Sequence, residues 1–387
     1  MPAAVVIFWQ LPERWRYWFL GAASLAFLAV IVPATAVTMS ALAIAVYWLN
    51  RPGKASIGAS LSLKISIGML LAYLFYFKYL PALASLSDGY SFANIALPMG
   101  ISYFTFKLIH YAIEQKRGNL PVHDFGDFLA FVFLIPIFTA GPIQRFELFV
   151  GQRSNGWSRD LAVEGIYRIA LGLIKKFVFG AQAFAMMTSI TNGDLGNFIY
   201  YLEDRNPLAA SAFLVSAYIY VYMDFAGYTD IAVGTSRLFG LRIMENFNFP
   251  FLAQNIGNLW KRWHMSLSNW CQTYVYMPTL GLTRNPYYAA FASFTVMGLW
   301  HGATLNFLFW GFYNAIGVCA YQWFNVTARK RKWKFQKSRI FGLCAYPMTF
   351  FFFAGSFAFT MTDQNAGLWG AFRLLAKSLF INLPPSF

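Results

Sequence analysis

The sequence predicts an all-α integral membrane protein whose chain crosses the bilayer many times. Hydrophobic residues make up 58% of the 387 positions and charged residues only 12%, too few to cover a water-soluble chain of this length. Aromatic residues reach 20%, a share that suits rings placed at the two membrane interfaces. Apolar runs recur along the whole chain. Together these observations predict about ten to twelve helical passes, some of them short.

The apolar runs define the expected helices in chain order. The first run, 17–49, is divided by Pro33 and predicts two helices. The later runs are 65–77, 92–106, 128–138, 177–190, 208–223, 287–324, 340–361 and a weaker one at 368–381. Several are shorter than the ~20 residues of a straight span and contain proline or glycine, as at 98–100 and 136–141. Non-helical backbone at membrane depth must be surrounded by protein or line a cavity, so these segments predict re-entrant stretches around a central funnel or tunnel.

The net charge of +15 arises mostly from residues between the apolar runs. That placement is typical of loops that face anionic lipid head groups, and it argues against nucleic acid as a partner. The densest basic run, 329–339, is expected on the cytoplasmic side as an anchoring loop, with docking of a carrier protein as the alternative. No repeat or linker divides the chain, so we expect one multi-pass domain over 1–387.

Two of the four histidines are candidates for chemistry. His301 lies within the apolar run 287–324, where an ionisable side chain is costly unless it serves a function. Its neighbours Gly298 and Gly302 allow close approach of either a helix or a substrate. His264 lies among Trp, Lys, Arg and Ser residues, which predicts either a membrane-interface belt or a polar mouth that receives a charged donor. The two histidines are 301 − 264 = 37 positions apart, and the sequence does not decide whether they meet.

The other ionisable residues favour structural roles. His110 and His123 bracket a polar loop and are expected at helix ends or in that loop. Asp224 and Asp230 are expected to pair with basic groups such as Arg237, in preference to a catalytic role or a two-carboxylate metal site.

The three cysteines include no CxxC pair, so neither a disulfide framework nor a metal site is expected. They are Cys271, Cys319 and Cys344, and Cys271 is a disfavoured candidate for a covalent acyl carrier. No motif of a serine hydrolase, a zinc protease or a nucleotide-hydrolysing enzyme is present.

Several motifs in order resemble the membrane-bound O-acyltransferase family, over roughly 97–324. They are 224–230 (DFAGYTD), 245–250 (ENFNFP), 260–266 (WKRWHMS) and 298–302 (GLWHG), with 97–106 (LPMGISYFTF) and 140–146 (AGPIQRF) upstream. The upstream segments look like the bacterial branch that includes alginate O-acetylation membrane proteins and teichoic acid D-alanyl transfer proteins. The family's hallmark histidine corresponds to His301, and the histidine of its second, polar motif corresponds to His264.

The resemblance implies transfer of an acyl group, most simply acetyl, from a cytoplasmic thioester donor to a hydroxyl. The donor would be acetyl-CoA or an acyl carrier protein, with no bound cofactor and no metal. The acceptor would be an exported polysaccharide or an extracytoplasmic acyltransferase partner, in the inner membrane of a bacterium. His301 would be the general base and would be buried and neutral, and His264 would orient substrate or shuttle the proton. Further positions of these motifs expected to bind substrate are Trp300, Asn306, Trp263 and Ser266.

Three alternatives remain at this point. The first is D-alanyl transfer from a carrier protein to a cell-envelope polymer. The second is a proton-coupled transporter or flippase that uses His301 and Asp224, although the sequence shows no pair of matching broken helices in repeated halves. The third is an inactive scaffold for envelope assembly.

Overall fold

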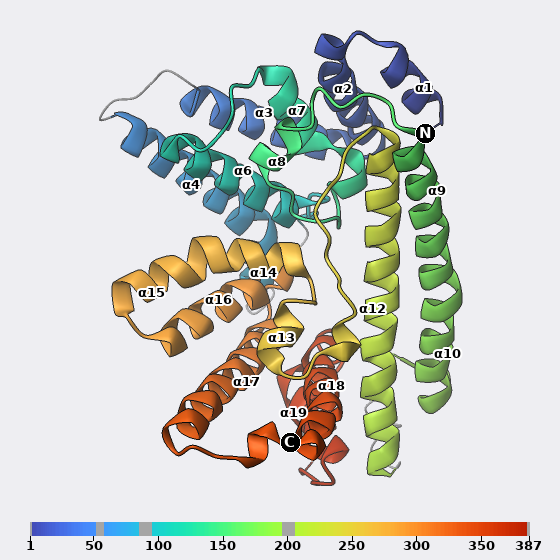
Figure 1. Ribbon diagram of the computed structural model, residues 1–387, viewed down its shortest axis with the longest axis vertical. Helices are drawn as coiled ribbons and strands as arrows, with labels where there is room; N and C mark the ends of the chain where they lie inside the picture. Colours follow the sequence, from blue (N-terminus) through green and yellow to red (C-terminus); the bar gives the residue numbers. More distant parts are fainter. Residues whose placement is uncertain (1, 52–57, 85–94, 196–205, 385–387) are drawn as a thin grey trace. The chain divides into compact units, whose positions relative to one another are not determined.

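The structure, a computed structural model, describes residues 2–51, 58–84, 95–195 and 206–384, and all regular elements in these ranges are helices (Figure 1). The predicted all-α class is therefore confirmed. Two compact units are formed from non-contiguous parts of the chain. Unit 1 comprises Met1–Gly172 and Tyr228–Met244, and unit 2 comprises Leu173–Gly227 and Glu245–Phe387. The single domain expected over 1–387 stays a prediction.

Unit 1 contains most of the helices from the first half of the chain. They are α1 (Pro2–Gln10), α2 (Glu13–Ile31), α3 (Pro33–Leu49), α4 (Gly58–Leu74), the π-helical η1 (Phe75–Tyr79), α5 (Leu80–Ala84), α6 (Ile101–Arg117), α7 (Phe125–Phe133), α8 (Phe146–Val150) and most of α9 (Arg159–Ile174). Pro33 is the first residue of α3, directly after the end of α2, which confirms the division of the first apolar run. Proline fits there because the first turn of a helix needs no partner for its N–H groups.

The two proline- and glycine-containing segments expected to be irregular contact each other inside unit 1. After α7 the chain is irregular except for the short 3₁₀ turn η3 (Ile135–Ile137). Gly100 has φ 75°, and a Cβ atom there would lie 2.7 Å from the carbonyl oxygen of Phe138. Phe138 is almost fully buried. This non-helical backbone is therefore surrounded by protein, as its composition requires.

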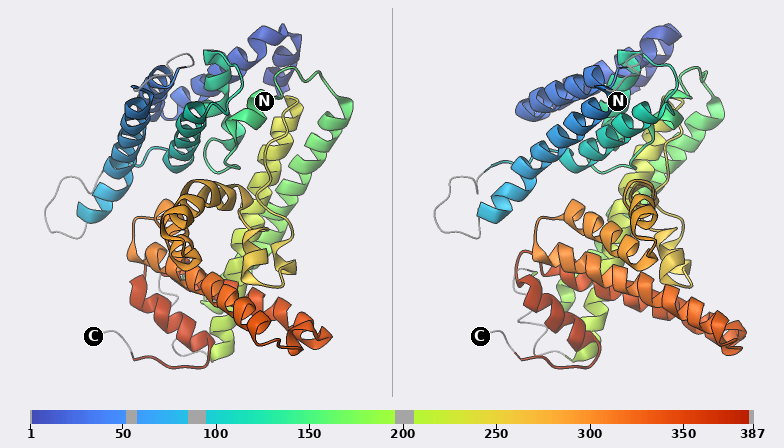
Figure 2. Two further views of the ribbon diagram at one scale, coloured as in Figure 1. Left: turned by 60° about the vertical axis from the view of Figure 1, so that its left-hand side comes forward. Right: turned by 90° about the vertical axis from the view of Figure 1, so that its left-hand side faces the viewer.

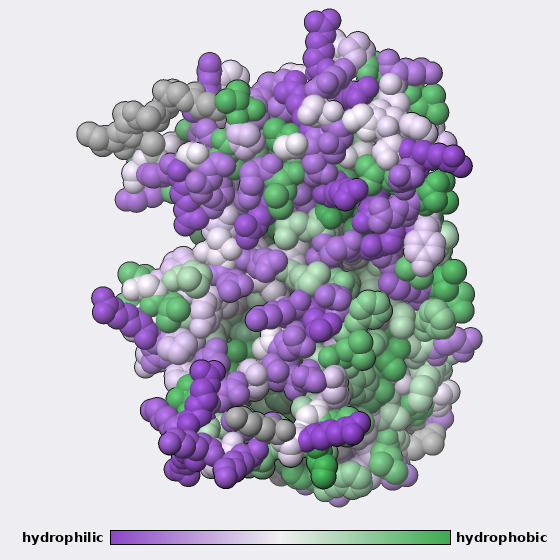
Figure 3. Space-filling model, viewed as in Figure 1, coloured by the Kyte–Doolittle hydropathy of each residue, from purple (hydrophilic) through white to green (hydrophobic). Residues whose placement is uncertain are grey.

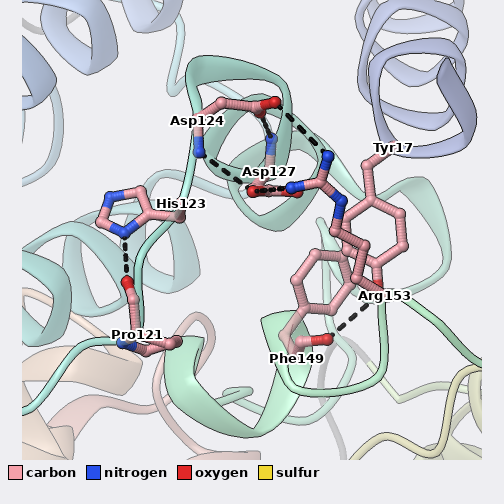
Figure 4. A network of polar contacts seen from close by, with 7 residues as sticks. All are labelled: Tyr17, Pro121, His123, Asp124, Asp127, Phe149 and Arg153. Carbon is pink, nitrogen blue, oxygen red and sulfur yellow. Dashed lines mark hydrogen bonds and ion pairs between the residues drawn. The ribbon is translucent and has the colours of Figure 1, made fainter. Parts of the chain in front are cut away.

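A polar network joins the start of α7 to the turn after α8 (Figure 4). Asp124 and Asp127 form a reciprocal capping box at the start of α7. The Arg153 guanidinium reaches both carboxylates, at 3.0 Å from Asp127 Oδ2 and 3.7 Å from Asp124 Oδ2. Nearby, the Tyr17 hydroxyl donates to the carbonyl oxygen of Phe149 at 3.1 Å. These contacts hold the irregular connection between α7 and α9 in one arrangement.

The helices in the middle of the chain are α9, the π-helical η4 (Lys175–Gly180), α10 (Ala181–Ile190) and α12 (Pro207–Leu238). Among them, α9 and α12 have residues in both units, whereas η4 and α10 belong to unit 2. Asp230 pairs with Arg168 at 2.6 Å in unit 1, and Asp224 pairs with Lys176 in unit 2. The predicted pairing of both aspartates with basic groups is confirmed, and Arg237 forms an ion pair with Glu164 at 2.6 Å.

Unit 2 contains the remaining helices. They are η5 (Pro250–Leu252), α13 (Ile256–Trp260), α14 (Met265–Cys271), the π-helical η6 (Gln272–Tyr276), α15 (Met277–Thr283), α16 (Pro286–His301), α17 (Leu305–Lys330), η7 (Phe335–Lys337), α18 (Arg339–Met361) and α19 (Gly367–Ser378). The run 287–324 is broken at 302–304 into α16 and α17, which lie side by side (Figure 2).

Four of the described helical stretches are long and apolar enough to cross a membrane: Ser60–Ala84, Arg159–Ile190, Pro207–Leu238 and Arg339–Met361. Apolar side chains gather on the surface of α10 and the adjacent first half of α12 (Figure 3), including the exposed Phe184, Met186 and Leu208. The integral membrane class is confirmed. The expected number of about ten to twelve passes stays a prediction, since further passes would have to be made by shorter helices.

We predict that Gly234→Ala destabilises the protein, whereas Gly68→Ala does not. A Cβ atom at Gly234 in α12 would lie 2.4 Å from the carbonyl oxygen of Gly165 in α9, so the two helices would have to separate. Gly68 lies in the apolar helix α4, and a Cβ atom there meets nothing within 4 Å. Overpacking of this kind costs about 1–3 kcal/mol, so the thermal midpoint of the detergent-solubilised protein should fall only for Gly234→Ala. Equal midpoints for the two variants would contradict the close contact.

Candidate functional site

His301 is the last residue of α16, and its side chain is exposed. Three aromatic rings surround the imidazole: Trp300 at 4.8 Å, Trp310 at 5.0 Å and Phe307 at 6.0 Å between ring centroids. The expectation that His301 is buried is therefore wrong. The helix ends at Gly302, so the imidazole stands at a helix terminus where it can be reached by another molecule.

The glycines around His301 serve the packing of α16 against α17. A Cβ atom at Gly298 would lie 2.3 Å from the carbonyl oxygen of Phe307, and one at Gly302 would overlap the Phe307 ring. On the facing helix, a Cβ atom at Gly311 would lie 2.3 Å from the carbonyl oxygen of Phe294. Of the two roles left open by the sequence, approach of a neighbouring helix is the one observed at these positions.

His264 occupies a strained turn between α13 and α14. Its backbone is left-handed, with φ 43° and ψ 51°, a conformation that is uncommon outside glycine, although histidine adopts it more often than most residues. Asn246 holds the turn on its far side: its carbonyl oxygen accepts from the Met265 N–H at 2.9 Å, and its Oδ1 accepts from the Ser266 hydroxyl at 2.6 Å. The motif 245–250 therefore supports the turn that carries His264.

The His264 ring lies beside His301, with 6.2 Å between ring centroids. It is only 2% exposed and packs edge-on against Phe225 at 4.7 Å and against Trp300 at 5.6 Å. Within the described part of the chain, its Nε2 is buried and has no hydrogen-bond partner. Burial first, and then the nearby His301, lower the pKa of His264 well below its usual value, so this imidazole is neutral.

The structure also places the other residues that the sequence singled out. Trp263 is buried in an aromatic cluster with Tyr218, Tyr222, Phe247, Phe353 and Phe357. The interface-belt interpretation of 260–266 is wrong for the tryptophans and the histidine, because Trp260, Trp263 and His264 are all buried.

Of the residues expected to bind substrate, Trp300 packs against both histidines, with its ring centroid 5.6 Å from that of His264 and 4.8 Å from that of His301. Ser266 contacts Asn246, as described above. Asn306 is buried, and its Nδ2 donates to the Phe359 carbonyl oxygen at 3.0 Å and to Thr362 Oγ1 at 2.9 Å. Those bonds tie the start of α17 to the end of α18. Substrate contact by these residues stays a prediction.

Sequence reasoning assigned no role to Phe225, Asn246, Phe307 or Trp310. Phe225 and Asn246 lie in motifs that carried the family resemblance, so the motifs themselves were the available signal. Phe307 and Trp310 follow His301 within an apolar run, and nothing in their spacing distinguishes them from other aromatic residues of that run.

A cavity of about 270 Å³ lies beside the two histidines within unit 2. Its lining includes Met265, the residue after His264, and Met297, one helical turn before His301. Trp260 and Ser293 also line it, and in the part of the chain that the structure describes the buried Trp260 Nε1 and Ser293 Oγ have no hydrogen-bond partner. Lys261 is the one charged residue in the lining. The cavity therefore offers an apolar passage with a few unsatisfied polar groups.

The other two histidines are structural. His110 is buried in the middle of α6, where its Nε2 accepts from the Phe146 N–H at 2.9 Å and lies 3.2 Å from Glu147 Oε2. His123 is buried, with Nε2 2.9 Å from the Tyr111 hydroxyl and Nδ1 2.8 Å from the Pro121 carbonyl oxygen (Figure 4). The expectation of ordinary loop or helix-end positions is wrong for His110, and His123 is a buried loop residue.

No metal-ligand cluster and no reactive thiol is found among the described residues. They contain no group of three His, Cys, Asp or Glu side chains that could hold a metal ion. Burial raises the pKa of the Cys271 thiol, so it stays protonated and unreactive. Cys319 is partly buried and Cys344 is exposed.

Comparison with known proteins shows which family model the chain matches and which proteins it is similar to. The model of the membrane-bound O-acyltransferase family matches residues 56–362. The probable alginate O-acetylase AlgI of Pseudomonas aeruginosa is 32% identical over 86% of this chain and 65% of its own length. The teichoic acid D-alanyltransferase of Bacillus subtilis is 33% identical over 67% of this chain and 68% of its own length. The peptidoglycan O-acetyltransferase of Helicobacter pylori is 27% identical over 61% of this chain and 50% of its own length. The chain thus spans just under two thirds of the P. aeruginosa relative.

We predict that the protein loses stability as the pH falls below about 6.5, and that His264→Asn reduces this loss. The folded-state pKa of His264 is lowered, so below the unfolded-state pKa of about 6.5 the unfolded chain takes up a proton that the folded protein does not. Folding is then disfavoured by up to about 1.4 kcal/mol per pH unit, and above that pH the contribution is constant. Asparagine tolerates the left-handed backbone and does not titrate.

The measurement is the difference in thermal midpoint between pH 7.5 and pH 5.5 for the two proteins. The other histidines contribute equally to both, so their effect cancels in the comparison. Identical differences for wild type and His264→Asn would show that His264 is not a buried neutral imidazole.

Proposed function

Because the chain belongs to the membrane-bound O-acyltransferase family, we propose that it transfers an acyl group, most simply acetyl, from a cytoplasmic thioester donor to a hydroxyl. The acceptor is an exported polysaccharide or an extracytoplasmic partner that completes the transfer, and the site of action is the bacterial inner membrane. The observation that carries the proposal is the meeting of His301 and His264, which are 37 positions apart in sequence and whose ring centroids are 6.2 Å apart.

His301 is the general base of the proposed reaction. A ring nitrogen of the exposed imidazole accepts the proton of the acceptor hydroxyl while the oxygen attacks the thioester carbonyl. The new C–O bond forms, the C–S bond breaks, and the proton passes from the imidazolium to the departing thiolate, so that no other reactant is consumed. Trp300, Phe307 and Trp310 form an aromatic wall beside the imidazole, against which the apolar part of a substrate can pack.

His264 assists without changing its charge. Its neutral ring carries either a donor or an acceptor at Nε2, depending on the tautomer, and that atom has no partner in the described residues. It can therefore donate a hydrogen bond to the developing oxyanion or orient the acceptor hydroxyl. The strained turn, fixed by Asn246, supports this role because strain of this kind persists where the surroundings hold it in place.

The cavity beside the histidines is the proposed path of the donor chain. Its apolar lining suits a flexible thioester arm, and the unpartnered Trp260 Nε1 and Ser293 Oγ can hydrogen-bond to amide groups of that arm. The Trp260 ring packs on Trp310 at 5.9 Å, and Trp310 packs on His301. A thioester arm that binds at Trp260 can therefore extend toward His301.

We predict that His301→Gln lowers acyl transfer at least about 100-fold and leaves the thermal midpoint nearly unchanged. Glutamine keeps a polar side chain of similar reach but cannot accept and return a proton, and general-base assistance is typically worth about 10²–10⁴ in rate. Because His301 is exposed, its replacement is not expected to lower acyl transfer by unfolding the protein. Asp160→Asn, at an exposed position in the first turn of α9, serves as the control. Wild-type turnover by His301→Gln would remove the base from the mechanism.

The donor decides between acetyl transfer and the D-alanyl transfer suggested by the Bacillus subtilis relative. We predict that membranes containing the protein incorporate label from [¹⁴C]acetyl-CoA into polymer or partner, and that His301→Gln abolishes this incorporation. The same membranes are given D-[¹⁴C]alanine on its carrier protein. Incorporation that occurs only from the alanyl carrier would replace acetyl transfer by alanyl transfer as the function.

A further inference from the structure

The corner between α16 and α17, residues 302–304, directly follows His301 and contains no helical residue. The Gly302 N–H donates to a carbonyl oxygen of α16 at 3.1 Å, and the Thr304 carbonyl oxygen accepts from an N–H of α17 at 3.2 Å. These two bonds continue the helices on either side and do not join them. Side chains must therefore fix the path of the corner.

The Thr304 side chain makes a contact that its position does not predict. Thr304 directly precedes α17, where a threonine hydroxyl usually accepts from an N–H of the first turn. No such bond forms here. The Thr304 hydroxyl donates instead to Oδ1 of Asp363, 59 positions later, in the turn that follows α18. The hydroxyl therefore joins two elements and does not cap its own helix.

Asp363 has no competing partner within the part of the chain that the structure describes. The bond from Thr304 is its one hydrogen bond there, and its carboxylate forms no ion pair. Because it accepts from the residue before α17, the carboxylate lies near the N-terminal end of that helix, where the helix dipole favours a negative charge. The contact is exposed. Its net contribution to folding is therefore small, since both groups can bond to water when it breaks.

A second contact, two residues further along the chain, ties the same two elements together. The buried Asn306 donates from Nδ2 to the Phe359 carbonyl oxygen at 3.0 Å and to Thr362 Oγ1 at 2.9 Å. Phe307, the next residue, stacks on the His301 ring with 6.0 Å between centroids. The end of α18 thus positions the first turn of α17, and that turn holds an aromatic ring against the imidazole.

The buried and the exposed contact differ in what their loss would do. Loss of the Asn306 amide would leave buried polar groups without a partner, which lowers stability. Loss of the bond between Thr304 and Asp363 would free the corner next to His301 and leave the buried contact in place. The exposed contact therefore acts on the site more than on the fold.

We propose that Asp363 is a positioning residue for acyl transfer. Through Thr304 it holds the corner 302–304 in one path, and the corner sets the direction in which the His301 imidazole faces the substrate. Asp363 does not touch the reacting atoms. The inference rests on the proposed acyl transfer, in which displacement of the base by about 1 Å costs on the order of 10²-fold in rate.

The test measures kcat and the KM of the donor in membranes that contain equal amounts of each variant. The donor is whichever of acetyl-CoA and the D-alanyl carrier protein the wild type uses. We expect Asp363→Ala to lower kcat at least about tenfold, with the KM of the donor and the thermal midpoint unchanged. Asp363→Asn keeps an oxygen that can accept from Thr304 and should retain most of the wild-type kcat. Gln364→Ala is the matched control, because Gln364 is the next residue, is exposed and has no hydrogen bond within the described residues.

Variants of Thr304 show whether the hydrogen bond itself carries the effect. Thr304→Val should lower kcat as much as Asp363→Ala, and Thr304→Ser, which keeps the hydroxyl, should restore it. The double variant of Thr304→Val and Asp363→Ala should be no slower than either single variant, because two residues that act through one contact are not additive.

A wild-type kcat in Asp363→Ala would overturn the positioning role and leave the acyl transfer standing. A higher KM of the donor at unchanged kcat would also overturn it, because Asp363 would then bind the donor directly. Equal losses in Asp363→Ala and Asp363→Asn would do the same, since the charge and not the hydrogen bond would be responsible. If the wild type transfers no acyl group from any thioester, the proposed function fails and the positioning role fails with it.

Discussion

The site depends on the close crossing of α16 and α17. Gly298 and Gly311 each face a backbone carbonyl of the other helix, at Phe307 and Phe294, so the helices approach to backbone contact. That approach sets Phe307 and Trp310 against the imidazole at the end of α16. Any side chain at either glycine would separate the helices, because the carbonyl groups it meets cannot move without loss of helical hydrogen bonds. Packing therefore fixes the position of the base.

The two imidazoles have opposite environments, and the difference suits a proton transfer. His301 is exposed and can meet a substrate, while His264 is buried with its pKa lowered. In the proposed reaction His301 becomes an imidazolium, and a second positive charge next to it would oppose that step. A neutral His264 does not oppose it. The strained turn held by Asn246 keeps the neutral ring beside the base and out of water.

The sequence predicted the class of the fold, most helix positions and the two histidines, because composition, proline positions and motifs carry that information locally. It could not predict which histidine is buried. His301 lies in the most apolar run, yet it is exposed because α16 ends there, and His264 lies among charged residues, yet the turn directs its ring inward. The burial of His264 depends on packing against Phe225, which lies 264 − 225 = 39 positions earlier and belongs to no periodic pattern, and the exposure of His301 depends on where α16 ends.

Charges distinguish acyl transfer from the transport of protons or cations. A proton relay through the membrane was expected to use Asp224, but that carboxylate pairs with Lys176, and Asp230 pairs with Arg168. In such an ion pair the two opposite charges neutralise each other, which allows both side chains to lie at membrane depth. The residues that line the cavity close to the two histidines include amides and one lysine but no carboxylate. Because this lining offers no acidic group to which a proton or a cation could bind, its composition does not favour the transport of either.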